Sequence, residues 1–220
     1  MFHRTKLSKF LLVAALVAGF SAALPVTANA QVAVYPGMTI RTSDRLCTVG
    51  ATGEIGTQKY AVTAAHCAEP NATVYDDNGT RIGWYAETSG DDVTTNSLGF
   101  ALVRLDKTVA ARASNGSFGL GSANTEAYIG QGVCHIGWAT RSCGAVVRNA
   151  ANYFITDFTS DKGDSGGPVF HTNLNGGADF LGLLIGTNPD GQVIVETAAY
   201  VREQIDATFN GAYHFTWYTS

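Results

Sequence analysis

Gly163-Asp164-Ser165-Gly166-Gly167-Pro168, with Thr63-Ala64-Ala65-His66-Cys67 far upstream, is the stretch on which the interpretation of this chain depends. The glycines around Ser165 allow a sharp turn that aims two backbone N–H groups at one point, as an oxyanion requires. His66 stands beside a cysteine that can anchor its loop. A Gly-rich run alone is a moderate signal, but the two motifs together predict acyl-transfer chemistry.

The chemistry assigns a role to each motif. A serine hydroxyl is a weak nucleophile and needs a neighbouring base to take its proton. His66 can be that base, because an imidazole titrates near neutral pH. The N–H groups of Gly163 and Ser165 would then form the oxyanion hole, where loss of one donor slows acyl transfer by about a hundred- to a thousandfold.

Residues 1–30 have the pattern of a secretory signal peptide. Arg4, Lys6 and Lys9 form a basic start, and an apolar run extends from Phe10 to Leu24. The small residues that end at Ala30 suit a cleavage site. A membrane span needs about 20 apolar residues, so we expect no stable membrane anchor. The mature chain, 31–220, is expected to be secreted, extracellular or in the cell envelope.

The net charge of the mature chain indicates which kinds of partner it can bind. Removal of residues 1–30 takes three of the 14 basic residues and none of the 18 acidic ones, which leaves 11 against 18 and a formal charge of −7. Nucleic-acid binding needs clustered basic residues, so no nucleic-acid partner is expected. We expect a monomer that acts on a protein or peptide substrate and uses no cofactor.

The cysteine count predicts disulfides. Cys47, Cys67, Cys134 and Cys143 all follow the export segment, and an even number in an exported chain favours disulfides, with three connectivities open. No pair has zinc-ligand spacing, so no metal site is expected.

The remaining pattern predicts an all-β fold. Short β-rich runs separated by Gly, Asn and Asp extend from Cys47 to about Val195, as in antiparallel sandwiches and barrels. Residues 111–124 have the composition of a connector. Residues 197–209 are expected to be helical, with Ala198, Val201, Ile205 and Phe209 on one face.

On these motifs the chain resembles the chymotrypsin-fold (trypsin-like) serine proteases, in particular the compact bacterial branch of α-lytic protease and the streptogrisins. The resemblance implies two antiparallel six-stranded β-barrels packed face to face, with a C-terminal helix. Residues 45–110 would form the first barrel with His66, and 125–196 the second with Ser165. The branch's two disulfide loops imply the pairs Cys47–Cys67 and Cys134–Cys143.

The resemblance also implies where substrate binds. Thr159 corresponds to the base of the specificity pocket, which suggests a neutral substrate side chain, although Asp157 and Asp161 are nearby in sequence. Ile185-Gly186-Thr187 would pair with an extended peptide as an added strand.

One departure concerns the third member of the catalytic triad. The family has an aspartate at the start of a strand written Asp-x-Ala-Leu-Val, and this chain has Gly99 there. Loss of that carboxylate costs about four powers of ten in turnover. Ile185 replaces the family's serine partner of that aspartate, and we hypothesise that Ile185 fills the space above Gly99. Candidates for a substitute orienter of the imidazole are Asp91, Asp92 and Asn96, and otherwise a Ser–His dyad remains.

A second departure concerns Asp164. The bacterial branch is expected to neutralise this aspartate with an arginine after the second-loop cysteine, where this chain has His135. We therefore predict a pH-sensitive contact between His135 and Asp164. Two functions remain open: a secreted serine endopeptidase, slow for lack of the usual Asp, or a pseudo-protease that binds peptides or proteins without efficient chemistry.

Overall fold

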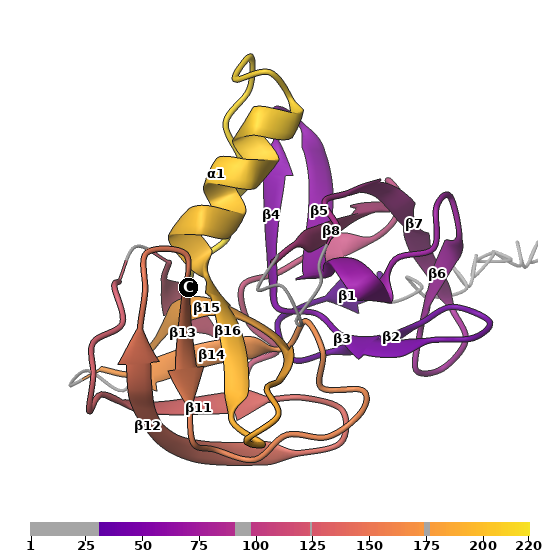
Figure 1. Cartoon of the computed structure of the whole chain (residues 1–220). Helices are drawn as coiled ribbons and strands as arrows, with labels where there is room; N and C mark the ends of the chain where they lie inside the picture. Colours follow the sequence, from indigo (N-terminus) through magenta and orange to yellow (C-terminus); the bar gives the residue numbers. More distant parts are fainter. Residues whose placement is uncertain (1–30, 91–97, 124, 174–176) are drawn as a thin grey trace, which may run out of the picture. The chain divides into compact units, whose positions relative to one another are not determined.

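The computed structural model describes residues 31–90, 98–123, 125–173 and 177–220. Within this part of the chain, strands make up most of the regular structure and one α-helix follows them. Figure 1 shows strands β1–β8 in indigo to magenta, strands β11–β15 in rose to orange and the helix in yellow. None of the described helices is both long and apolar enough to span a bilayer.

The first sheet has eight strands in the order β17-β4-β5-β8-β7-β6-β2-β3. Every pairing in it is antiparallel. Its strands are β2 (Thr39–Arg41), β3 (Leu46–Thr48), β4 (Ala51–Ile55), β5 (Gln58–Ala64), β6 (Thr73–Asp76), β7 (Arg81–Thr88), β8 (Phe100–Leu105) and β17 (Thr216–Trp217).

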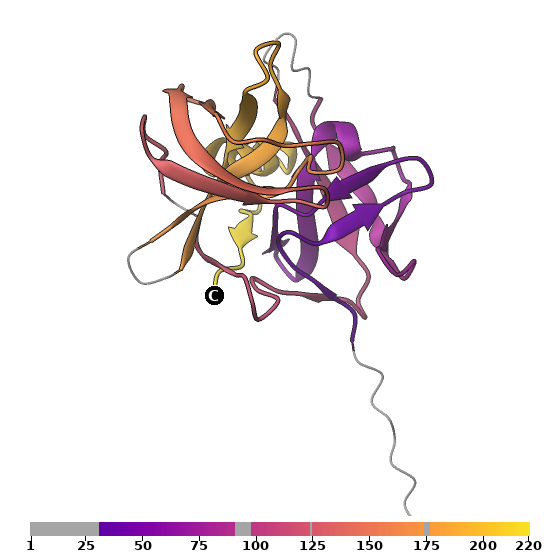
Figure 2. The same cartoon turned by 90° about the horizontal axis from the view of Figure 1, so that it is seen from below.

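The second sheet contains a closed barrel. Its order is β10-β15-β14-β11-β12-β13-β16, and β15 also pairs with β16, so six antiparallel strands form a ring. Figure 2 shows these strands from below. They are β11 (Gly132–Ile136), β12 (Arg141–Asn149), β13 (Tyr153–Thr156), β14 (Pro168–Thr172), β15 (Ala178–Thr187) and β16 (Val193–Thr197), with β10 (Leu120–Ser122) at the edge.

The predicted two-barrel fold is confirmed, with two differences in the first half: its described sheet has eight strands instead of six, and no pairing among the described strands closes it into a ring. That sheet also contains β2 and β17, which lie outside residues 45–110. A two-residue strand such as β17 is too short for an alternating pattern to reveal. It is anchored instead by Trp217, whose ring lies 5.3 Å from Phe180 and 4.7 Å from Phe215. Two further short strands, β1 (Ala33–Val34) and β9 (Ala110–Ala111), pair in parallel.

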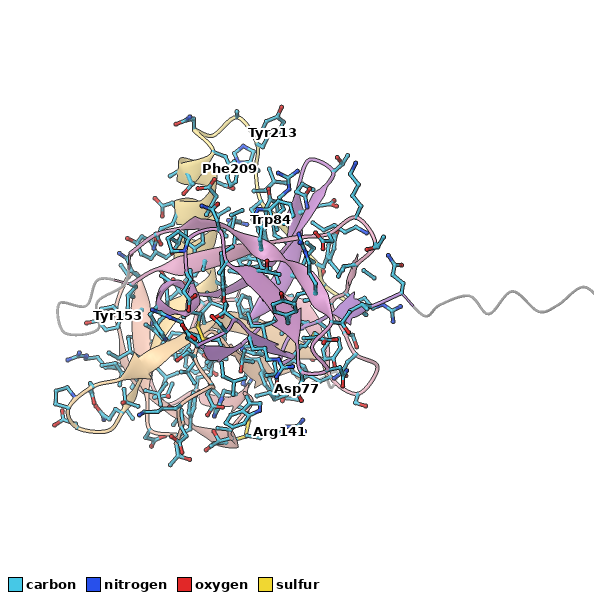
Figure 3. All side chains as sticks on the ribbon, turned by 90° about the vertical axis from the view of Figure 1, so that its right-hand side faces the viewer. Asp77, Trp84, Arg141, Tyr153, Phe209 and Tyr213 are labelled. Carbon is cyan, nitrogen blue, oxygen red and sulfur yellow. A yellow bond between two sulfur atoms is a disulfide. The ribbon has the colours of Figure 1, made fainter. Side chains whose placement is uncertain are left out.

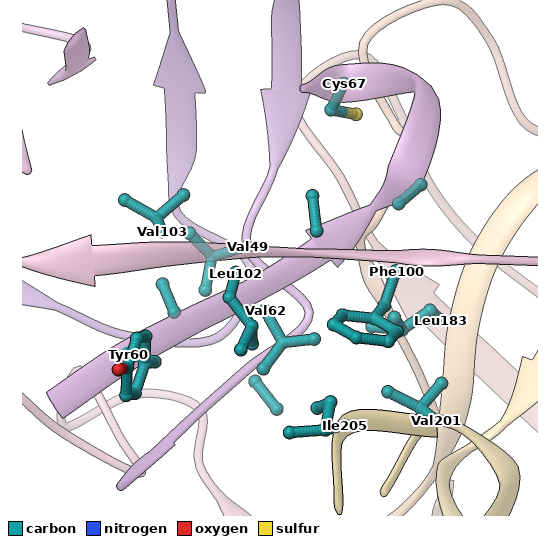
Figure 4. Packing of buried hydrophobic residues seen from close by; sticks show 14 of the residues in the cluster. Val49, Tyr60, Val62, Cys67, Phe100, Leu102, Val103, Leu183, Val201 and Ile205 are labelled. Carbon is teal, nitrogen blue, oxygen red and sulfur yellow. The ribbon is translucent and has the colours of Figure 1, made fainter. Parts of the chain in front are cut away.

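The C-terminal helix forms as predicted. Helix α1 (Ala198–Thr208) begins after Thr197, whose hydroxyl accepts the Tyr200 N–H at 3.3 Å and so caps a free donor of the first turn. Val201 and Ile205 are fully buried. Figure 4 shows them beside Phe100 of β8 and Leu183 of β15, in one apolar cluster. The helix therefore packs on a core to which strands of both sheets contribute.

The outer face of the first sheet is polar by comparison. Trp84 on β7, labelled in Figure 3, has the guanidinium of Arg104 5.3 Å from its ring centre and that of Arg81 at 5.9 Å. Arg81 is also paired with Asp106 at 3.0 Å. These long side chains cover the aromatic ring while their charged ends stay near water.

Both disulfides implied by the resemblance are confirmed: Cys47–Cys67 and Cys134–Cys143. The second bridge joins residues that face each other directly on β11 and β12. No described cysteine is free.

Candidate active site

His66 is the middle residue of a single 3-10 turn, η1 (Ala65–Cys67), that directly follows β5. The turn is fixed on both sides, because Cys67 is bonded to Cys47 and the Ala65 N–H donates to the Gly99 carbonyl at 3.0 Å. The Arg45 guanidinium donates to the carbonyl of His66 itself. The imidazole is thus carried on a short, well-anchored turn and is half-buried.

Ser165 lies on the loop between β13 and β14, and glycines determine the shape of that loop. Gly163 has φ +99° and Gly166 has φ +80°, a left-handed region that favours glycine. A Cβ at Gly166 would also collide with the Thr63 hydroxyl and lie 2.7 Å from the Ala64 nitrogen. The Gly-Asp-Ser-Gly sequence is therefore required by the backbone at this point, where it meets the end of β5.

The turn with His66 and the loop with Ser165 meet at the Ser165 carbonyl. This oxygen accepts the Thr48 N–H at 2.9 Å and lies 3.8 Å from the Cys67 sulfur, one residue after His66. The Thr48 hydroxyl donates to the Gly163 carbonyl at 2.8 Å. No sequence motif marks Thr48 as a functional residue. It is nevertheless fully buried, and it connects the serine loop to the first sheet.

The serine loop leaves two backbone donors available. Its carbonyls at Gly163 and Ser165 are both bonded to Thr48, which fixes the direction of the intervening peptide planes. Among the described residues, neither the Gly163 N–H nor the Ser165 N–H donates to a protein acceptor. A pair of such N–H groups beside a serine hydroxyl can bind the oxygen of a tetrahedral intermediate.

The space beside Gly99 is filled by main chain. A Cβ added at Gly99 would lie 2.6 Å from the Gly90 carbonyl oxygen and 2.8 Å from that of Ser89. Ile185 is buried in the apolar cluster that also contains Leu98 and Phe100, on either side of Gly99, and the hypothesis that it fills the space above Gly99 stays a prediction. The candidate orienters Asp91, Asp92 and Asn96 lie outside the described residues.

The first predicted specificity residue, Thr159, lies on the loop that follows β13. Thr159 is exposed, and its hydroxyl donates to the Ser142 hydroxyl at 3.2 Å, so its role as the base of a pocket stays a prediction. Asp157 accepts the Ala145 N–H at 2.7 Å, and Asp161 accepts the Lys162 N–H at 2.7 Å, which engages both carboxylates locally.

Ile185, Gly186 and Thr187 form the last part of β15. They pair with β16 on one edge, and pairing with β14 ends at Leu183. Beyond the bonds that Leu184 makes with Gly166 and Gly167, no described strand covers the other edge of this segment. That edge can accept an extended peptide as an added strand.

Asp164 is fully buried beside Ser165 and does not contact His135 directly. Its carboxylate accepts four hydrogen bonds, from the Ala139, Thr140 and Asp161 N–H groups and from the Thr140 hydroxyl at 2.7 Å. The predicted direct contact is wrong, because Thr140 lies between the two, with its hydroxyl 2.9 Å from His135 Nε2. Burial lowers the pKa of His135, and the Asp164 charge opposes part of that shift.

Comparisons with known proteins identify relatives of the chain and structures with the same fold. No protein-family model matches the chain. Two relatives from Mycobacterium tuberculosis, the uncharacterized proteins MT1863 (strain CDC 1551) and Rv1815 (strain H37Rv), are each 36% identical, with 78% of this chain and 81% of the relative covered. The chain belongs to their family.

Solved structures define the fold. Protease A of Thermobifida fusca matches with a TM-score of 0.66 at 19% identity, over 86% of this chain and all of the other. A chymotrypsin of Cellulomonas bogoriensis gives 0.62 at 20% identity, over 86% and all of its length, and a Nocardiopsis protease gives 0.64 at 19%, over 85% and all of its length. This is the bacterial chymotrypsin fold. In that fold, the loop with Ser165 and the turn with His66 lie where the two barrels meet.

No group of three or more His, Cys, Asp or Glu side chains within the described ranges is arranged to hold a metal ion.

Proposed function

We propose that this protein is a secreted serine endopeptidase that cleaves extended peptide segments through an acyl-enzyme on Ser165. The observation that carries the proposal is the junction at the Ser165 carbonyl, which is bonded to Thr48 and lies 3.8 Å from the residue after His66. The bacterial protease fold supports hydrolase chemistry at this junction. Two disulfides fit an oxidising, extracytoplasmic location.

The proposed reaction uses groups on both barrels. His66 takes the hydroxyl proton as Ser165 Oγ attacks the substrate carbonyl carbon, and the carbonyl oxygen becomes an oxyanion. The N–H groups of Gly163 and Ser165 bind that oxyanion. His66 then gives its proton to the departing amine, which leaves an ester on Ser165. Water, activated by His66, hydrolyses the ester and restores the hydroxyl.

Substrate is proposed to bind along the free edge of β15. The main chain of Ile185–Thr187 offers hydrogen-bonding groups there, and an added peptide strand would reach Ser165 through the bonds between Leu184 and Gly166. The substrate side chain near Thr159 is proposed to be neutral, because the threonine hydroxyl carries no charge to pair with a cation.

A second candidate function is a peptide-binding pseudo-protease. The observation that favours it is Gly99, where the main chain of residues 89–90 occupies the position of a side chain. A binding module would keep the β15 edge and the fold while its serine is not activated. The two candidates differ in the reactivity of Ser165.

Labelling by a fluorophosphonate separates them, because the probe reacts with an activated serine. We expect the wild-type protein to be labelled at Ser165, Ser165→Ala to lose labelling completely and His66→Gln to lose most of it. Ser160→Ala is the matched control, since it removes a hydroxyl from the same loop. A folded wild-type protein without labelling would overturn the proposed enzyme and favour the binding module.

Cleavage of a peptide library then tests substrate choice. We expect cleavage after neutral residues, and suppression of cleavage by Gly186→Pro, because proline removes an N–H from the β15 edge. Cleavage restricted to sites after Lys or Arg would contradict the neutral pocket.

A further inference from the structure

We propose that His135 and Thr140 are positioning residues that hold Asp164, and with it the oxyanion turn, through a neutral hydrogen-bond relay. The chain His135–Thr140–Asp164 takes the place of a cation beside the buried carboxylate. This inference rests on the proposed function of Ser165, because it concerns the shape of the same loop. The relay itself can be tested in a protein that has no activity.

The carboxylate fixes the direction of the relay. An ionised carboxylate only accepts hydrogen bonds, and each Asp164 oxygen already faces two donors. Within the described ranges, no Lys, Arg or His forms an ion pair with Asp164. The single hydroxyl proton of Thr140 therefore points to Asp164 Oδ2, 2.7 Å away.

The hydroxyl in turn fixes the tautomer of His135. Thr140 Oγ1 has used its proton, so it must accept from His135 Nε2 at 2.9 Å. The Thr159 carbonyl, 3.1 Å from the same nitrogen, is also an acceptor. Both contacts require a proton on Nε2. His135 therefore connects the Thr159 segment to the loop that holds Asp164.

The other side of the ring makes protonation unfavourable. His135 is 1% exposed and stacks on Phe158 with ring centres 4.8 Å apart. Its Nδ1 is buried and has no hydrogen-bond partner among the described residues. A second proton would have to sit on Nδ1 without an acceptor, in a place that water does not reach.

Among the charged groups near His135, Asp164 is the one whose charge affects the pKa of the ring. Other titratable side chains on the neighbouring segments are engaged elsewhere or exposed: Asp157 with Ala145, Asp161 with Lys162, His171 with Gly132, and the exposed Arg141 and Lys162. Burial lowers the pKa of the ring more than Asp164 raises it. At acid pH, a second proton on Nδ1 would be buried without an acceptor, which disfavours the ring in this position. If the ring moves away, Thr140 loses its Nε2 donor and Asp164 is held less firmly.

Two pairs of variants test the relay. His135→Phe keeps the ring stack but removes the donor, whereas His135→Gln keeps an N–H donor that does not titrate. Thr140→Val removes the hydroxyl and Thr140→Ser keeps it. We expect fluorophosphonate labelling to slow about tenfold to a hundredfold in Thr140→Val, because a hydrogen bond to the charged Asp164 is lost. The slowing should be smaller, about tenfold, in His135→Phe, which removes only the donor to the neutral Thr140 hydroxyl. His135→Gln and Thr140→Ser should retain most of the rate.

The pH profile distinguishes positioning from a general loss of stability. We expect the wild-type labelling rate to fall more at acid pH than the rate of His135→Gln, because the amide at position 135 cannot gain a proton. Equal labelling rates in all four variants, or an unchanged profile in His135→Gln, would overturn the proposal.

Imidazole nitrogen NMR of the inactive Ser165→Ala protein gives a readout that does not depend on catalysis. We expect His135 to carry its proton on Nε2 at neutral pH and to titrate below 6.5, its ordinary value. A proton on Nδ1, or titration at or above 6.5, would contradict the relay. If the wild-type protein is not labelled but His135 shows the expected tautomer, the proposed enzyme is overturned and the relay is still supported.

Discussion

The loop with Ser165 and the turn with His66 are held in different ways. Around Ser165, buried polar groups from both barrels fix the backbone: Thr48 bonds two carbonyls, and Asp164 accepts four donors. Around His66, anchoring comes from a disulfide, from the Gly99 carbonyl and from Arg45. The serine loop is thus fixed by buried polar groups, whereas beside the turn with His66 the main chain of residues 89–90 lies where a side chain at Gly99 would begin.

The largest effect is expected at Gly166. Gly166→Ala would force an unfavourable φ and push a methyl group into the end of β5, so we expect a loss of at least about 3 kcal/mol in unfolding free energy. Gly191→Ala is the matched control, because its φ is +78° and nothing lies within 4 Å. We expect that control to cost about 1 kcal/mol. Urea denaturation of the two variants measures the difference, and equal losses would mean that the junction of the barrels tolerates the methyl group.

Asp164→Asn should have the next largest effect. An amide would turn one oxygen into a donor that faces other donors in a fully buried place, at a cost of about 3 kcal/mol, and labelling of Ser165 should fall with it. Asp161→Asn keeps its backbone donor to Asp164 and is exposed, so we expect it to stay within about 0.5 kcal/mol of wild type. Similar stabilities for the two variants would show that the four donors do not depend on the charge.

Substitutions at Gly99 test the packing beside the turn with His66. Gly99→Ala should cost about 1–3 kcal/mol, because the Gly90 carbonyl lies 2.6 Å from the added methyl group. Gly132→Ala, on open space in β11, should stay within about 0.5 kcal/mol. Gly99→Asp, which restores the family's residue in sequence, should not increase labelling. A more active Gly99→Asp protein would show that the 89–90 segment moves aside.

Three further variants test whether a side chain outside the described residues orients the His66 imidazole. Asp91→Asn, Asp92→Asn and Asn96→Ala each remove one candidate. A fall of about four powers of ten in the rate of Ser165 labelling in one variant would identify the group that orients His66. Changes of only a few-fold in the labelling rate of all three variants would indicate a Ser–His dyad.

The smallest effect is the pH dependence of stability that His135 contributes. Its folded pKa lies below the unfolded value of 6.5, so the unfolded chain binds more protons as pH falls below 6.5. The stabilisation is complete above that pH and is lost below it, with a slope of no more than about 1.4 kcal/mol per pH unit for one proton. Urea midpoints between pH 7.5 and 5 should therefore fall less in His135→Gln than in wild type. Parallel curves would mean that His135 titrates normally when folded.

The sequence by itself determined the all-β class, the C-terminal helix and the residues of the serine loop. These depend on local properties: alternation along strands, an apolar stripe on a helix, and glycines where φ must be positive. The two disulfide pairs followed from the resemblance, because composition left three pairings open.

Contacts between distant segments were decided by the tertiary structure alone. Thr48 and Thr140 have no distinctive spacing, and their roles arise because folding places each hydroxyl near one buried acceptor. The close approach of residues 89–90 to Gly99 likewise depends on how one loop packs on a strand. A pattern along the chain records local backbone preference and burial, whereas the partner of a buried polar atom is fixed only when separate strands are brought together.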